Sequence, residues 1–131
     1  MQNKPLIGFY IDPESNTAEP REIVDSLDNY YELLACDTID ITTRCVHGVR
    51  FDVVCDDNGL LVEKPIPSAL FPDGHVALVG RLFLCFDDTN EPNPDGELLS
   101  LSPPAIILLR SRVVRYELNG KHYTALLLDA F

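Results

Sequence analysis

The N-terminal half of the chain carries acidic side chains at a helical spacing. Glu19-Pro20 opens a predicted helix over residues 20–35, which places apolar side chains along one of its sides. Residues three and four apart lie on the same side of a helix, with neighbours about 5 Å apart. The other side of this predicted helix therefore carries four carboxylates, those of Glu22, Asp25, Asp28 and Glu32. Asp37 and Asp40 continue the acidic run beyond it.

These six acids predict a binding surface for a protein with a basic surface, such as one whose basic channel normally holds nucleic acid. The same charge repels nucleic acid and anionic lipid, so neither direct nucleic-acid binding nor membrane binding is expected. However, any amphipathic helix needs a solvated face, and carboxylates serve that purpose without a partner. The sequence leaves both interpretations open.

A second set of charged residues is basic and gathers near the C-terminus, with one member in the middle of the chain. Arginine forks beside Tyr116 or Tyr123 would suit a nucleotide-like ligand. In a strand that starts at residue 112, alternation places Arg112 and Arg115 on opposite faces, so one flat pocket cannot use both unless an oligomer joins the faces. These bases could equally balance neighbouring acids or dock the acidic half of a second copy. The set comprises Arg81, Arg110, Arg112, Arg115, Lys121 and His122.

No pattern in the sequence indicates catalysis. The three histidines are isolated from one another and lie in no nucleophile motif, and the seven glycines are scattered through turns instead of forming a phosphate-binding loop. The carboxylate pair Asp56-Asp57 fits turn chemistry, and Asp87-Asp88 opens a loop whose glycine does not match a calcium-binding spacing. We therefore expect a protein that is not an enzyme and needs no cofactor.

The cysteines predict neither a metal site nor a disulfide framework. Cys36, Cys45, Cys55 and Cys85 form no Cys-x-x-Cys pair, and Cys45-Val46-His47 lacks further ligands at zinc-like spacing. We interpret all four as reduced, buried small hydrophobes, as in a cytoplasmic protein. The absence of an apolar run of about 18 residues argues against a transmembrane helix.

Composition predicts one acidic globular domain, residues 1–131. The 131 residues are 46% hydrophobic and 24% charged, and the net charge is −11. Thirteen acids and three arginines give residues 12–63 a balance of −10, whereas eight acids and seven bases leave −1 for the rest. Electrostatic complementarity between the two parts permits self-association.

The elements expected from periodicity and turn signals give an α+β fold. Strands are predicted at residues 5–11, 38–44 and 75–86, the last being apolar and central with a bulge or close approach at Gly80. Asn58-Gly59 predicts a hairpin of residues 49–55 and 60–64, and Asn119-Gly120 a hairpin of residues 112–118 and 121–129. Residues 68–71 are predicted as one helical turn, 87–97 as an acidic loop, and 103–110 as a helix behind a Ser102 N-cap. We expect one largely antiparallel sheet of about six or seven strands, with two main helices packed on one face.

The order of these elements, together with short motifs, resembles a known family. The motifs are Ile39-Asp40-Ile41, the turn at residues 55–59, Ser68-Ala69-Leu70, residues 78–84 and Ser100-Leu101-Ser102-Pro103. Residues 5–110 resemble domain-of-unknown-function family three-eight-four-six, uncharacterised small proteins of phages, plasmids and gut Firmicutes. This chain departs from the family at residues 56–60 and carries Pro67-Ser68-Ala69 where relatives tend to have Asn-Arg-Ala. Residues 111–131 look like an added C-terminal hairpin.

The resemblance implies a mobile-element context, in which short cytoplasmic proteins often modulate host machinery or block host defence. Combined with the charge pattern, it predicts a binding protein that inhibits a host (defence) protein through the acidic N-terminal surface. The alternative prediction is binding or sequestration of a nucleotide-like signalling ligand at the basic C-terminal end, with a homo-oligomer as one arrangement.

Overall fold

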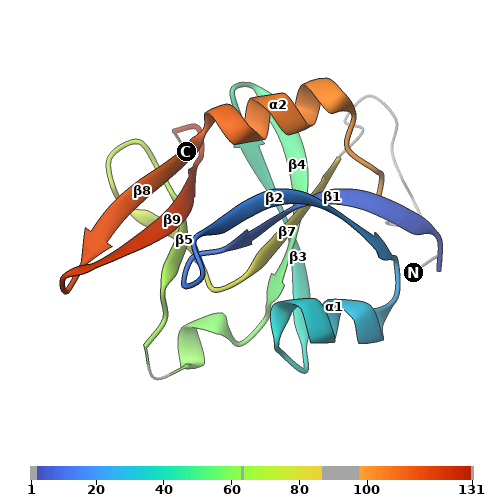
Figure 1. Cartoon of the computed structure of the whole chain (residues 1–131), viewed down its shortest axis with the longest axis horizontal. Helices are drawn as coiled ribbons and strands as arrows, with labels where there is room; N and C mark the ends of the chain where they lie inside the picture. Colours follow the sequence, from blue (N-terminus) through green and yellow to red (C-terminus); the bar gives the residue numbers. More distant parts are fainter. Residues whose placement is uncertain (1–2, 63, 87–97, 131) are drawn as a thin grey trace.

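The computed structural model describes residues 3–62, 64–86 and 98–130, and within them it shows two sheets and two α-helices (Figure 1). The first sheet is antiparallel throughout, in the order β2 (Thr17–Val24), β1 (Pro5–Asp12), β7 (Leu82–Phe86), β4 (Val49–Asp56) and β3 (Ile39–Val46). The second sheet has the order β6 (Val76–Val79), β5 (Pro67–Leu70), β9 (Lys121–Leu127) and β8 (Val113–Leu118), with β5 and β9 parallel. The α+β class is confirmed, but nine described strands divide into two sheets instead of forming one.

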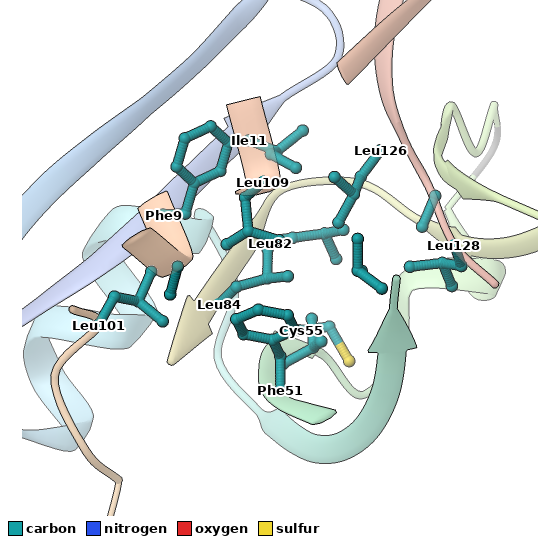
Figure 2. Close-up of a cluster of buried hydrophobic side chains, with 14 residues drawn as sticks. Phe9, Ile11, Phe51, Cys55, Leu82, Leu84, Leu101, Leu109, Leu126 and Leu128 are labelled. Atoms are coloured by element: carbon teal, nitrogen blue, oxygen red, sulfur yellow. The ribbon is translucent and has the colours of Figure 1, made fainter. Parts of the chain in front are cut away.

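The first sheet lies between two apolar layers, because successive residues of each strand point to opposite faces. Phe9 and Ile11 of β1 face one layer, which α2 (Pro103–Ser111) and the second sheet complete. Figure 2 shows this layer, which includes Leu109 of α2, Leu126 of β9 and Phe51 of β4, with Leu82 of β7 between them. The opposite layer contains Leu6, Tyr10, Val54 and Phe83, covered by Tyr30 and Leu34 of α1 (Leu27–Leu34). The two helices thus cover opposite faces, and the prediction of a single helical face is wrong.

The helix predicted over residues 20–35 is replaced by a strand and a shorter helix. Residues 17–24 form β2, which pairs with β1 along its whole length and places Pro20 opposite Phe9. Proline has no N–H to donate, but β2 is an edge strand, where a missing donor facing outward does no harm. The helix begins only after Ser26, whose side chain accepts a hydrogen bond from the Asn29 N–H, and it ends at Ala35 in a left-handed conformation.

Two further turn predictions are wrong. Asn58-Gly59 does not join two strands, because residues Gly59–Leu61 form a 3-10 turn, η1. The hairpin before it turns instead at His47-Gly48, where both residues have positive φ and join β3 to β4. Residues 68–71, predicted as a helical turn, lie largely in β5, which pairs with both β6 and β9.

The long strand predicted over residues 75–86 is divided between the two sheets. Gly80 adopts a φ of +76°, a conformation that an L-residue rarely takes, and the chain changes sheet there from β6 to β7. The Ser102 N-cap of α2 and the Asn119-Gly120 hairpin of β8 and β9 are confirmed. The predicted acidic loop 87–97 lies outside the described residues.

Candidate functional site

The predicted acidic helical face does not exist as such. Glu22 lies on β2 and Asp28 and Glu32 lie on α1, all three exposed. Asp25 precedes the helix and is only 3% exposed, and its carboxylate accepts a 2.6 Å hydrogen bond from the Tyr30 hydroxyl. Its backbone N–H also donates to the Lys4 carbonyl. Asp25 is therefore buried and hydrogen-bonded beside the start of α1, and its predicted position on an exposed helical face is wrong.

Three of the other predicted acids, Glu32, Asp37 and Asp40, contribute to a different surface, which we term the acidic groove, whereas Glu22 and Asp28 do not line it. It consists of two adjoining hollows that share Asp56 and Leu61. The first, about 600 Å³, lies between the C-terminal end of α1 and η1, and the second, about 560 Å³, lies between β6, η1 and the ends of β3 and β4. The carboxylates lining the groove are those of Glu32, Asp37, Asp40, Asp56 and Asp57.

Charge in the acidic groove has one sign. Among the described residues that line either hollow there is no lysine and no arginine. Like charges held close together repel, so a cationic partner would relieve the repulsion as well as gain its own attraction. The groove therefore favours a positively charged occupant.

A short network holds the acids of the groove in place. The Asp56 carboxylate accepts a 2.9 Å hydrogen bond from the Asn58 N–H, and the Asn58 side-chain amide donates to the Thr38 hydroxyl at 2.8 Å. The Asp57 N–H donates to the Thr38 carbonyl at 3.2 Å. These bonds join the turn after β4 to the segment before β3, so acids from two parts of the chain form one surface. Sequence reasoning interpreted Asp56 and Asp57 only as turn residues and missed this role.

Apolar side chains accompany the acids. Leu61 is 81% exposed and Val62 and Val76 are each 49% exposed, and all three line the groove. Cys55 lies at its base, where burial and the nearby Asp40 raise the pKa of the thiol to about 11. Burial, with Asp56 nearby, also raises the pKa of Cys36. Both thiols are protonated near neutral pH, so the groove offers a binding surface and not a reactive thiolate.

The free state of all four cysteines agrees with the sequence analysis, but their predicted burial holds only in part. Cys55 and Cys85 are buried, Cys36 is intermediate and Cys45 is exposed. Within the described residues, no group of three or more His, Cys, Asp or Glu side chains is placed to hold a metal ion. In the same residues, no helix has the length and apolar character needed to cross a membrane.

The predicted basic residues do not meet in one site. Arg112 lies 3.7 Å from the Asp129 carboxylate, and His122 lies 3.9 Å from Glu117. The remaining three at the C-terminal end are exposed on different elements, Arg110 on α2, Arg115 on β8 and Lys121 on β9.

Arg81, which follows β6, lines a third hollow of about 430 Å³ together with Arg21 and Tyr10. Its guanidinium lies 3.5 Å from the Asp12 carboxylate and donates to the Leu33 carbonyl. Arg21 stacks 4.2 Å above the Tyr10 ring and forms a 2.6 Å ion pair with Glu19. Sequence reasoning missed Arg21 and Tyr10. Because each arginine already has a carboxylate partner, this hollow attracts anions weakly.

Comparison with known proteins gives one match, a family model described as Domain of unknown function (DUF3846), which covers residues 7–105. Neither the curated proteins nor the solved structures contain a match to this chain.

Proposed function

We propose that this chain, which belongs to the DUF3846 family, a domain of unknown function, acts by binding a protein with a basic surface. The proposal rests on the acidic groove of the chain itself. The single observation that supports this proposal is the lining of the groove. Five carboxylates and three exposed apolar side chains lie together there, without a compensating lysine or arginine among the described lining residues. Charge complementarity of this kind speeds encounter and selects the partner, and apolar contact adds affinity.

The proposal extends to the consequence of binding. In the mobile-element setting implied by the family resemblance, the partner is a host protein, and occupation of its basic surface by the acidic groove inhibits it. The protein then works by occupancy, without catalysis and without a cofactor. The support for this step is chemical: a basic surface that serves nucleic acid or other anions is blocked by a competing set of carboxylates.

The alternative, a nucleotide-like ligand held by the basic C-terminal end, has less support. Arg112 and His122 lie near carboxylates, and the other bases lie on separate elements. A nucleotide site would need several donors directed at one phosphate. We therefore base the proposed function on the acidic groove alone.

Charge reversal in the groove tests the proposal with a fluorescent heptalysine peptide as the cationic probe. Asp37→Lys combined with Asp57→Lys should weaken binding about tenfold or more at low salt. Raising the ionic strength should weaken binding to the unaltered protein, because exposed charges are screened. Fluorescence anisotropy measures both effects.

A matched variant separates the groove from the overall charge. Glu14→Lys combined with Glu117→Lys also changes the net charge from −11 to −7, since each reversal adds two units, but both residues lie outside the groove lining. This control should keep most of the affinity. Equal losses in the two double variants would mean that only net charge matters, and the groove would be rejected as the binding site.

A further inference from the structure

The outer edge of β6 differs from every other sheet edge that the structure describes. The two sheets end in four edge strands, β2, β3, β6 and β8. Three of them carry charged side chains, and β2 carries a proline in addition, the features that natural proteins use to keep sheet edges from pairing. The sequence of β6, Val-Ala-Leu-Val, has neither a charge nor a proline. Its edge therefore lacks the charges and the proline of the other three edges, and only its length of four residues and its irregular register with β5 limit pairing with another strand.

This edge borders the acidic groove. All four residues of β6 line the hollow that also contains Asp40, Asp56 and Asp57. Gly59 of η1 lies close to Val79, since a Cβ at that glycine would be 3.2 Å from the valine side chain. The turn thus approaches β6 at its C-terminal end, whereas Val76 at its N-terminal end is 49% exposed. An uncharged strand edge, exposed apolar side chains and three carboxylates therefore line one hollow.

We propose that β6 receives an extended segment of the partner as an additional strand, whose side chains alternate between apolar and basic. This inference rests on the proposed function and specifies its partner. Backbone hydrogen bonds to β6 supply the affinity common to strand addition. Because strand side chains alternate in direction, apolar residues can enter the hollow beside Leu61 and Val76. The intervening lysines or arginines leave the strand on its other side, and their long, flexible side chains extend around it to the exposed Asp40 and Asp57.

Charge distinguishes this occupant from a second copy of the same chain. Pairing of two β6 edges would bring together two copies of Asp40, Asp56 and Asp57 in chains that each carry a net charge of −11. Repulsion between like charges at close range opposes that pairing near neutral pH. A basic segment meets no such opposition.

Four synthetic heptapeptides test the backbone and side-chain parts of the inference. The first alternates lysine and valine, and the second is all lysine. The third and fourth repeat the first with N-methyl groups on alternate backbone amides along one edge, one peptide for each register. An extended heptapeptide spans about 23 Å, enough to overlap the whole of β6. We expect the alternating peptide to bind about tenfold or more tightly than heptalysine, and one N-methyl register to abolish that gain.

A variant of the protein separates strand addition from simple charge attraction. Val76→Asp adds an acid to the groove, so charge attraction alone predicts equal or tighter binding of the alternating peptide. Strand addition predicts a loss of about tenfold, because the new carboxylate is placed against an apolar contact. Ile107→Asp is the matched control: Ile107 is 66% exposed on α2, outside the groove lining, and its replacement changes the net charge equally.

The outcomes separate the two proposals. Loss of binding in Val76→Asp but not in Ile107→Asp, with sensitivity to one N-methyl register, supports strand addition at β6. Unchanged or tighter binding by Val76→Asp, or indifference of the peptide to both N-methyl registers, overturns strand addition even if charge reversal in the groove still abolishes heptalysine binding. Dimerisation of the protein in place of peptide binding would also overturn it. A thermal melt of each variant verifies folding, and the N-methyl peptides test the inference on the unaltered protein.

Discussion

Asp129 fastens the C-terminal end of the chain to the β3–β4 turn. Its carboxylate accepts 2.7 Å hydrogen bonds from the N–H groups of His47 and Gly48, and Arg112 lies 3.7 Å away. The hydrogen bonds from Gly48 and then His47, together with the positive charge of Arg112, lower the pKa of Asp129. Because hydrogen bonds to charged groups contribute about 1.5–3 kcal/mol each, we expect Asp129→Ala to lower the free energy of unfolding by roughly 3 kcal/mol at pH 7.

The pH dependence of this loss tests its cause. A carboxyl group with a lowered folded-state pKa contributes stability that is complete above its unfolded pKa of about 3.9 and disappears as pH falls through the folded value. The gap between Asp129→Ala and the unaltered protein should therefore narrow on acidification from pH 7 to about 3, whereas exposed Glu14→Ala should show little gap at either pH. Urea unfolding measures both gaps. A gap of the same size at both pH values would contradict a role for the carboxylate charge.

Residues were predictable from sequence where their structural role is local. The Ser102 cap depends on an N–H three residues away, and the Asn119-Gly120 turn on its own backbone. Asp129 reaches partners 82 and 81 residues away, which no local pattern reveals. Asp25 shows the same limit, because it has the spacing of a surface acid but becomes buried when Lys4 and Tyr30 fold onto it.

At the scale of the elements, the first sheet depends on the close approach of β1 to β7 at Gly8. A Cβ at Gly8 would lie 2.4 Å from the ring of the fully buried Phe83 and 2.7 Å from the Leu84 carbonyl. We expect Gly8→Ala to push the strands apart and cost roughly 3 kcal/mol of unfolding free energy, as overpacking does. At Gly80 a Cβ would meet open space, so Gly80→Ala should cost only about 1–2 kcal/mol, from its positive φ. Chemical denaturation of both variants measures the order, and a larger loss for Gly80→Ala would contradict this account.

Strand pairing also explains which elements the sequence could not predict. Residues 17–24 combine acids, a proline and two terminal apolar residues, a composition that also suits the first turns of a helix. Their pairing with β1 along eight positions decides the outcome. The groove was predictable in part for a related reason. The sequence predicts Glu32, Asp37 and Asp40 as partner-binding acids, and all three line the groove. Their neighbours Asp56 and Asp57 come close through the pairing of β3 with β4, whereas the sequence predicts a different hairpin for β4.

At the scale of the whole molecule, the C-terminal hairpin is part of the core. The family match ends at residue 105, yet β9 pairs in parallel with β5, and Leu126 and Leu128 are buried in the larger apolar layer. Structurally, then, β8 and β9 complete the second sheet. Because β9 and β5 are distant in sequence and parallel, no turn signal indicates their contact. The second sheet, and with it the β6 edge, therefore escapes prediction from local pattern.

Net charge controls whether that edge stays unpaired when no partner is present. At pH 7 a net charge of −11 opposes association between copies, but the sequence pI is about 4.4, and as the pH falls towards it the net charge approaches zero. We expect self-association to rise on acidification from pH 7 to the pI, measured by sedimentation velocity. Val76→Lys should suppress it by adding charge to the edge strand, more than Ile107→Lys, which carries the same charge on α2. Equal suppression by the two variants would show that association depends on net charge alone and that the β6 edge does not mediate it.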